Sequence, residues 1–481
     1  MILIVILVIP LIAAGLSLIP LGKRFAPAVT LIGAIAVLIA SLRVALRVAS
    51  GNRVVMIENW MSCDGLSALV LLLIVLVGVT AALFSWGYVE KISHGNGHEK
   101  LRYYYANYNL FLLSLLAVPL FVELALVWIA VELTTLLSVL LVGFENTREA
   151  LEAAWKYIVL TLMGAAIALL GFLILFWGLR AAGGSIYTWD GLIAAAPNMP
   201  PVLLQTAFLL ILVGFGAKAG LVPLHTWLPD AHSQAPSPVC ALLSGVETTA
   251  VLYAILRMIP ILNAVPSLRA GAWAVVFGLI SVGVAAFLLL QVRDYKRLFA
   301  YSTVEHMGII LVATGLGSSA AHYGAVYQIL SHAITKSFCF FAAGAVLLAV
   351  GTREITSVQG LIRTSPTAGI ALLFGGLAIS GAPPFAVFLS EFSILKAGLS
   401  NSQYIAVGLL ALFIVIAFFG IMLHINQMVF GQPNVIPEGV NLPTSCVIAL
   451  ILSVIPIVVF GLYVPGPLHE LLHLAANCLE R

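Results

Sequence analysis

The chain has 481 residues, of which 62% are hydrophobic and 9% charged, and its formal net charge is +3. Soluble domains carry roughly 25% charged residues, so this composition excludes a soluble protein and indicates an integral membrane protein. The small net charge, with no basic cluster among aromatic residues, excludes a nucleic-acid-binding protein. The 5 cysteines lie far apart without a CxxC pair, so we expect no iron–sulfur cluster, zinc site or other cofactor on this chain.

Apolar runs of about 20 residues, each long enough to cross a hydrocarbon core about 30 Å thick, recur along the chain. Strands are not expected in these runs, because lipid offers no partner for an open strand edge and the runs lack barrel alternation. The predicted fold class is an all-α integral membrane protein with about 14 transmembrane helices. In chain order they lie near residues 2–19, 26–46, 66–86, 105–121, 124–144, 153–178, 203–221, 238–256, 272–292, 298–316, 323–350, 368–397, 405–429 and 446–464.

The loops between these runs differ in basic content, with about 12 lysines and arginines in one set and about 7 in the other. The positive-inside rule places the richer set in the cytoplasm, and an even number of spans then puts both termini on the outer side. We interpret the polar stretch 87–102 as a solvated loop rather than a metal site on His94 and His98. The C-terminal stretch HELLHLAANCLER predicts an amphipathic interfacial helix, since His469 and His473 have no third ligand nearby.

Ionisable side chains recur inside the expected spans, where each costs at least a few kcal/mol. Buried ion pairs that hold helices together are one explanation, but such pairs stabilise weakly and packing needs far fewer of them. A series of Glu, His and Lys across a membrane interior is what a proton relay requires. The charged positions, in chain order, are Glu132, Lys218, Glu247, Glu305, His306, His332, Lys336, Glu391 and Lys396.

Spacing along the helices predicts which of these groups can meet. His332 and Lys336 are four residues apart and share one helix face, so they can exchange a proton directly or through one water. Glu391 and Lys396 are five residues apart and point about 140° away from each other, so we expect them to serve different neighbours. Hydroxyls in membrane helices often bond their own backbone, but several lie beside the charges and would extend a relay: Thr134, Thr135, Ser138, Ser244, Thr248 and Thr249.

Two of the spans contain helix breakers beside a charge. In the seventh, Gly220 precedes Pro223; in the twelfth, Gly381 precedes Pro383 and Pro384. Such breaks free backbone groups at membrane depth, which is tolerable only where protein or cavity water satisfies them. Interrupted spans at corresponding positions are typical of inverted-repeat transporters.

The breaks divide the chain into four expected parts. Each break lies in the fourth span of a block of five, and an odd number of spans inverts the second block relative to the first. The parts are an N-terminal three-helix segment, 1–102; a first five-helix repeat forming one half-channel, 103–257; a second, 270–430; and a C-terminal helix with an amphipathic tail, 431–481.

Five stretches of the chain contain most of these charges and both breaks: LVWIAVELTTLLSVLLVGF, GFGAKAGLVPLHTWLPDAHSQAPSPVCALLSGV, AYSTVEHMG, SHAITKSFCFFAAG and SGAPPFAVFLSEFSILK. Together they resemble the antiporter-like membrane subunits of respiratory complex I, Mrp-type cation/proton antiporters and group 4 membrane-bound hydrogenases. The resemblance covers about residues 103–397 and implies a fourteen-helix fold with two inverted repeats and a proton path in the membrane plane. Within the family, STVEHMG looks most like the hydrogenase-4 component F branch.

The resemblance also assigns roles residue by residue. Glu132 resembles the family's fifth-helix glutamate and Lys218 its seventh-helix lysine, a charge pair thought to control proton loading. Many relatives carry a bridging lysine or histidine where Thr249 stands, so here Glu247, water or both would join the halves. The rest of the candidate path is the central pair Lys336 with His332, the terminal carboxylate Glu391 with Lys396 as a secondary candidate, and Glu305, His306 and His225.

The sequence therefore predicts a proton-translocating subunit, with Na⁺ coupling left open, that has no redox centre of its own. The resemblance implies a redox-driven complex of the group 4 hydrogenase or formate hydrogenlyase type in a prokaryotic cytoplasmic (inner) membrane. Nickel–iron and iron–sulfur clusters are then expected on its partner membrane and soluble subunits. A complex I subunit, an Mrp-type antiporter subunit, a scaffold that has lost transport and a stand-alone transporter for an organic substrate are the alternatives.

Overall fold

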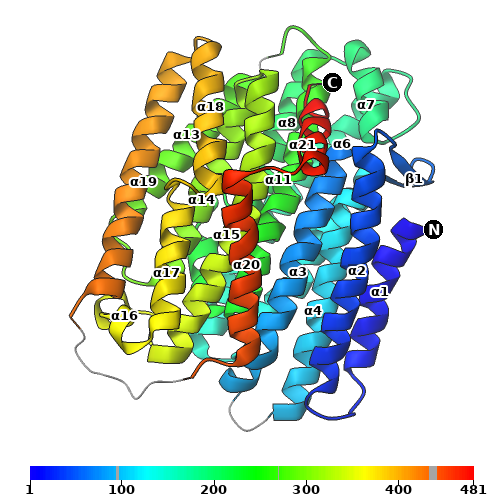
Figure 1. Cartoon of the computed structure of the whole chain (residues 1–481). Coiled ribbons are helices and arrows are strands. Elements are labelled where there is room, and N and C mark those ends of the chain that lie inside the picture. Colours follow the sequence, from blue (N-terminus) through cyan, green and yellow to red (C-terminus); the bar gives the residue numbers. More distant parts are fainter. Residues whose placement is uncertain (94–96, 269, 433–440, 481) are drawn as a thin grey trace.

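The structure of the protein is a computed structural model that describes residues 1–93, 97–268, 270–432 and 441–480. Long helices stand side by side in one bundle (Figure 1), with the C-terminal helix at the upper end. Each expected apolar run corresponds to a helix or to consecutive helices. The fold is thus that of a multi-span helical membrane protein, as the sequence predicts.

The first quarter of the chain contains four long helices and one hairpin. Its elements are α1 (Ile2–Ser17), α2 (Phe25–Ala49), β1 (Val54–Ile57), β2 (Met61–Cys63), α3 (Gly65–Ile92) and α4 (Gly97–Leu120). The two strands are antiparallel and lie between α2 and α3. The prediction of an all-α chain missed this hairpin, which lies outside the apolar runs and therefore does not need lipid to satisfy its edges.

The middle of the chain contains the first interrupted span. Its elements are α5 (Leu124–Val142), α6 (Arg148–Ala181), α7 (Trp189–Ala195), η1 (Ala196–Asn198), α8 (Pro201–Ala219), α9 (Trp227–Gln234), α10 (Ser237–Leu242), η2 (Leu243–Glu247), α11 (Thr248–Leu256) and α12 (Met258–Asn263). The short element η2 is a π-helical turn, and its residues join α10 to α11 without a break in the chain direction.

The last part contains the second interrupted span. Its elements are α13 (Ala270–Leu289), α14 (Tyr295–Gly315), α15 (Ser319–Val350), η3 (Ile355–Ser357), α16 (Leu361–Thr364), α17 (Pro366–Ile379), α18 (Ala386–Ser400), α19 (Tyr404–Phe430), α20 (Thr444–Leu462) and α21 (Gly466–Asn477). In Figure 1, α17 lies in the lower half of the bundle and α18 in the upper half. The expected amphipathic tail is α21, which packs its apolar face on α3 and α15.

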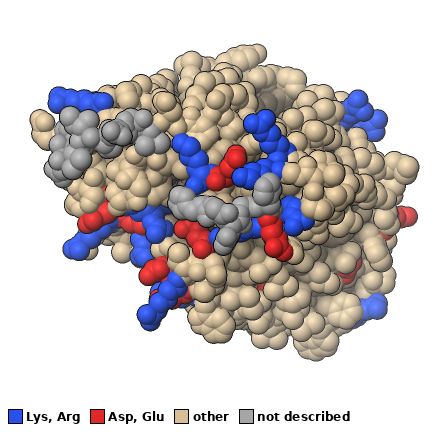
Figure 2. Space-filling view, turned by 90° about the horizontal axis from the view of Figure 1, so that it is seen from below, with Lys and Arg blue, Asp and Glu red and all other residues tan. Residues whose placement is uncertain are grey.

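By length and hydropathy, 11 of the described helices are able to cross a membrane, and α1 and α17 are shorter apolar helices. The number of fourteen spans and the four-part division of the chain therefore stay predictions. The stretch 87–102 lies partly outside the described residues. Figure 2 shows the face seen from below, on which basic and acidic side chains gather.

Glycines allow some helices to approach closely. A Cβ atom at Gly278 of α13 would lie 2.7 Å from the carbonyl oxygen of Gly308 on α14, and one at Gly164 of α6 would lie 2.5 Å from that of Gly214 on α8. Neither position has room for a side chain while the helices keep this distance. Small residues at such contacts are typical of helix pairs in membranes.

An ion pair at the upper end of the bundle fastens α3 to the end of α11. Asp64 caps α3 by accepting a hydrogen bond from the Ser67 amide at 3.0 Å, and its two oxygens lie 2.5 and 2.6 Å from the guanidinium nitrogens of Arg257. Burial alone would raise the pKa of the Asp64 carboxyl, but Arg257 and the capping bond hold that pKa well below its usual range.

We expect Gly278→Ala to destabilise the fold by about 1–3 kcal/mol, because the new methyl group must push α13 away from α14. The matched control is Gly408→Ala in α19, where a Cβ atom would meet nothing within 4 Å. Thermal unfolding of both variants in detergent measures the difference. Equal unfolding temperatures for the two variants would contradict the close α13–α14 contact.

Candidate functional site

The two interrupted spans break in the same way. In the first, α8 ends at Gly220 with a φ of 84°, and the Leu221 amide donates to the Gly216 carbonyl at 2.8 Å. In the second, Gly381 has a φ of 76°, and the Ala382 amide donates to the Leu377 carbonyl at 3.0 Å. A positive φ favours glycine. The hydrogen bond from the next residue's amide to the carbonyl five residues earlier closes the helix end. A cis peptide bond precedes Pro223 and Pro384, the third residue after each glycine.

Protein groups satisfy the backbone that these breaks set free. The indole nitrogen of Trp227 donates to the Ala217 carbonyl at 2.7 Å, and the Val222 amide donates to the Ser281 hydroxyl of α13 at 3.1 Å. At the second break, His306 Nε2 lies 3.1 Å from the Ile379 carbonyl. His225 lies between α8 and α9 and is buried. At each break, side chains of the protein therefore bond backbone groups that the helix no longer satisfies, as a membrane interior requires.

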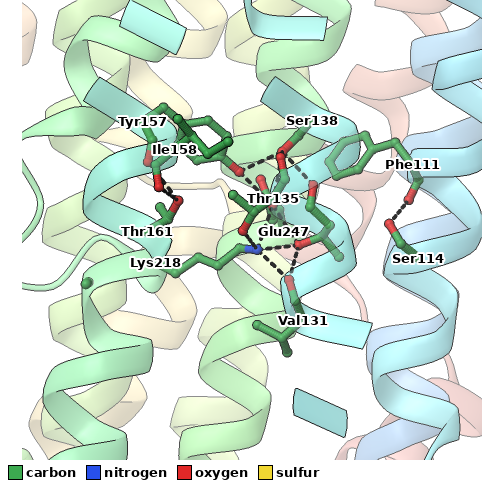
Figure 3. A network of polar contacts seen from close by, with 12 residues as sticks. Phe111, Ser114, Val131, Thr135, Ser138, Tyr157, Ile158, Thr161, Lys218 and Glu247 are labelled. Atoms are coloured by element: carbon green, nitrogen blue, oxygen red, sulfur yellow. Dashed lines mark hydrogen bonds and ion pairs between the residues drawn. The ribbon is translucent and has the colours of Figure 1, made fainter. Parts of the chain in front are cut away.

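Lys218 lies in the last turn of α8 and is 1% exposed. Its ammonium group donates to the Val131 carbonyl at 2.5 Å and to the hydroxyls of Thr134 and Thr135 at 2.6 and 2.5 Å, all on α5 (Figure 3). The Nζ atom also lies 3.5 Å from Oε1 of Glu247. One buried cation is thus held by three neutral oxygens and one carboxylate.

Glu247 is the last residue of the π-helical turn η2, and it is also 1% exposed. Its Oε1 accepts hydrogen bonds from the Thr134 hydroxyl at 2.8 Å and from the Tyr157 hydroxyl at 3.0 Å. The Tyr157 hydroxyl also lies 2.6 Å from the Ser138 hydroxyl (Figure 3). Thr134 therefore joins Lys218 to Glu247 through one oxygen.

The structure changes the expected partner of Lys218. The resemblance paired it with Glu132, but within the described residues its ion pair is with Glu247, and both carboxylate oxygens of Glu132 are buried without a hydrogen-bond partner. The reason is the position of η2, which brings Glu247 within ion-pair distance of Lys218 and within hydrogen-bond distance of Thr134 on α5. Thr248 and Thr249, expected as relay groups, donate to backbone carbonyls of their own helix.

The second half contains a matching buried lysine. Lys336 of α15 donates to the Phe299 carbonyl at 2.7 Å and to the Ser302 hydroxyl, both on α14. His332, one turn earlier, lies 3.1 Å from the Ser244 carbonyl instead. No hydrogen bond joins His332 to Lys336 among the described residues, so the pair predicted from spacing shares a helix face but not a direct contact.

The π-helical turn η2 contacts helices of both predicted repeats. Its last residue, Glu247, pairs with Lys218, while the carbonyl of Ser244 accepts from His332 and the Ser244 hydroxyl lies 2.6 Å from the Thr303 hydroxyl on α14. The His332 ring in turn lies 5.3 Å from the ring of His306. This turn lies where the sequence predicted that Glu247, water or both would join the two repeats.

The two charges of α18 lie in different surroundings, as their spacing predicts. The Glu391 carboxylate lies over the second break, since a Cβ atom at Gly381 would overlap its Oε2. Lys396 lines a cavity of about 440 Å³ with Tyr323, His469 and other residues of α15 and α21. Glu305 of α14 is 3% exposed, and its Oε2 has no hydrogen-bond partner among the described side chains.

Sequence reasoning missed a charged cluster at the lower end of the first half. Asp230 of α9 forms ion pairs with Lys156 of α6 at 3.1 Å and with Arg297 of α14 at 2.7 Å. It stands ten residues after Gly220, just as Glu391 stands ten residues after Gly381. The equal spacing from the two glycines was the sequence signal that could have singled out Asp230.

The described residues contain no group of three or more His, Cys, Asp or Glu side chains placed to hold a metal ion. His469 and His473 approach each other, with their Nε2 atoms 3.1 Å apart, and His469 also contacts the Tyr323 hydroxyl at 2.9 Å. The two buried lysines of the site therefore contact hydroxyls and backbone carbonyls, and Lys218 also contacts a carboxylate. Such an arrangement suits the movement of protons between side chains.

Known proteins share this fold and these sequence patterns. The family described as NADH:quinone oxidoreductase/Mrp antiporter, TM, matches residues 122–419. A "Hydrogenase-4 component F homolog" of Methylacidiphilum infernorum is 39% identical over 377 residues, which cover 77% of this chain and 79% of that protein. "Hydrogenase-4 component B" of Escherichia coli is 32% identical over 359 residues, 72% of this chain but 52% of that protein.

A solved structure agrees over nearly the whole length. A chain of the membrane-bound sulfane sulfur reductase (MBS), an archaeal respiratory membrane complex, superposes with a TM-score of 0.88 at 25% sequence identity. The match covers 99% of this chain and 97% of that chain. The bundle thus shares its overall fold with a chain of an archaeal respiratory membrane complex.

We expect Glu247→Gln to destabilise the fold by about 3–5 kcal/mol, because it leaves the buried Lys218 ammonium without its carboxylate. The matched variant is Glu132→Gln, whose carboxylate has no ion pair in this structure, so a change within about 1 kcal/mol is expected. Thermal unfolding in detergent compares the two. A larger loss for Glu132→Gln would show that Lys218 depends on Glu132 instead.

Proposed function

We propose that this chain, which belongs to the NADH:quinone oxidoreductase/Mrp antiporter family of membrane proteins, is an antiporter-like subunit that moves protons in a redox-driven complex. The single observation that carries the proposal is the buried contact of Lys218 with Glu247 and the Thr134 hydroxyl, beside a break in its own helix. A charge in a membrane interior is costly and therefore indicates a function. When such a group has a partner that is able to move away, that movement changes its protonation.

The switch we propose is a change of distance between Lys218 and a carboxylate. A nearby negative charge favours the ammonium form of a lysine, so Lys218 holds its proton while Glu247 lies 3.5 Å away. When the carboxylate moves away or is neutralised, the ammonium group loses this stabilisation and releases its proton. Glu132, three residues before Thr135 on α5 and without an ion pair in this conformation, supplies a second position for the pairing.

From this pair we propose that protons pass to the second half at η2. Ser244 of this turn contacts His332, whose ring faces His306, and Lys336 lies one turn further along α15. Glu391 over the second break would be the last group of the path, with Glu305, His225 and Lys396 as further members. Water molecules would complete the steps that side chains do not span directly, as in other buried relays.

The relatives suggest which complex contains this subunit. Two relatives of this chain are named hydrogenase-4 components, and the similar solved chain belongs to a respiratory membrane complex. We therefore propose a group 4 membrane-bound hydrogenase or formate hydrogenlyase type, with nickel–iron and iron–sulfur clusters on partner subunits. Complex I and Mrp-type assemblies are the alternatives in the same family, and Na⁺ is the alternative ion.

For the cell, we propose a prokaryotic cytoplasmic membrane with both termini on the outer side. The charged face in Figure 2 lies at the end of the bundle opposite the C-terminal helix, and the positive-inside rule would place it in the cytoplasm.

Lys218→Met should abolish proton uptake into proteoliposomes that contain the assembled complex, because methionine fills the same space but carries no proton. The control is Lys23→Met, which removes an exposed lysine and is expected to leave uptake unchanged. Subunit composition in native gels checks assembly of both variants. Wild-type uptake by an assembled Lys218→Met complex would refute the proposed relay.

The chains that copurify with this subunit in mild detergent should include a nickel–iron large subunit, identified by mass spectrometry and metal analysis. An NADH-oxidising module among them would instead assign the chain to complex I. Copurification of antiporter subunits without any redox protein would assign it to an Mrp-type assembly.

A further inference from the structure

A continuous hydrogen-bonded chain in the second half contains two residues that the proposed path does not use. Gln328 of α15 and Ser390 of α18 are both 0% exposed, as is His306. Gln328 Nε2 lies 3.0 Å from His306 Nδ1, and the Ser390 hydroxyl donates to Gln328 Oε1 at 2.5 Å. At the other end, His306 Nε2 lies 3.1 Å from the Ile379 carbonyl at the second break. The chain therefore runs from the break to the residue directly before Glu391.

The direction of these bonds fixes the state of His306. The amide nitrogen of Gln328 can only donate, so Nδ1 of His306 must accept and carries no hydrogen. The ring hydrogen is then on Nε2, where it meets the Ile379 carbonyl, which can only accept. His306 is thus a neutral imidazole whose free basic nitrogen is covered by an amide N–H group.

We propose that Gln328 is a positioning residue that turns its amide over whenever His306 gains or loses a proton. This inference rests on the proposed function, since it adds a moving part to the same relay. A proton that arrives at Nδ1 makes that atom a donor, and the amide must then present Oε1 in place of its NH₂ group. The carboxamide occupies the same space in both orientations, so the change requires only rotation about its last side-chain bond.

The rotation changes the bonds of Ser390. In the turned orientation the amide NH₂ group faces Ser390, so the hydroxyl oxygen accepts, and its hydrogen is free to bond the Val387 carbonyl, 2.8 Å away. When the proton leaves Nδ1, each step reverses. The only covalent change is the gain or loss of one N–H bond on His306, and no other reactant is needed. The protonation of His306 is thereby transmitted to α18 next to Glu391.

Charged and titratable groups surround His306 on each element packed against it. Glu305 precedes it on α14, His332 and Lys336 lie on α15, and Glu391 lies on α18. None of the hydrogen bonds of His306 in the described structure involves these four groups. The amide of Gln328 is therefore the polar side chain that responds directly to a proton on Nδ1.

Gln328→Leu, assayed by proton uptake into proteoliposomes with the assembled complex, should lower uptake about tenfold, since the protonated His306 loses its buried acceptor. Gln328→Glu should partly restore uptake as the pH falls, because a protonated carboxyl group can donate to Nδ1 and accept from Ser390. An ionised carboxylate only accepts and would hold the second proton on His306. The matched control is Thr335→Val, on the same helix and buried with a hydroxyl that has no partner among the described residues.

The outcomes separate this inference from the relay itself. If Lys218→Met abolishes uptake while Gln328→Leu keeps the wild-type rate and pH profile, the amide rotation is wrong and the relay stands. If both variants pump like the wild type, the proposed function fails. Equal loss in Gln328→Leu and Thr335→Val, or no acid-side recovery in Gln328→Glu, would assign Gln328 a packing role and overturn the inference.

Discussion

The structure depends on one constraint: a charge or a free backbone group inside the bundle is costly unless a group of the protein satisfies it. Lys218 illustrates this constraint, because its ammonium group is enclosed by a carbonyl, two hydroxyls and one carboxylate. The breaks obey the same constraint, with Trp227 and His306 taking the carbonyls that the helices release. Polar side chains inside the bundle are therefore joined by hydrogen bonds into networks, and a hydrogen-bonded network is able to pass a proton.

Several of these contacts involve helix irregularities. Each break begins with a glycine of positive φ, and the π-helical turn η2 lies between the two breaks in the sequence. In a regular α-helix the backbone carbonyls already bond their own helix, and the Val131 and Phe299 carbonyls, which also accept from lysines, are exceptions. At the irregular positions, by contrast, the carbonyls of Ser244 and Ile379 bind histidines of other helices. The irregular turns thus place backbone carbonyls against histidines of other helices.

Sequence patterns predicted the parts that depend on local chemistry. Hydropathy located the helices, and Gly220 and Gly381, each followed by proline, located both breaks. The partner of Lys218 could not be predicted, because it depends on how η2 turns Glu247 towards α5, and no local signal marks a π-helical turn. The ion pairs of Asp230 and the contacts of Gln328 likewise join helices far apart in the sequence, so only the folded chain reveals them.

The π-helical turn also has a consequence for how this sequence can change over time. Such a turn holds one more residue than the α-helical turn it replaces, so it shifts the phase of everything that follows by about 100°. A single deletion within Leu243–Glu247 would restore a regular helix, which bundle packing tolerates, yet it would rotate Ser244 and Glu247 relative to each other. One residue of chain length thus determines whether Glu247 faces Lys218 while Ser244 faces His332, so a single-codon deletion is enough to separate these two contacts.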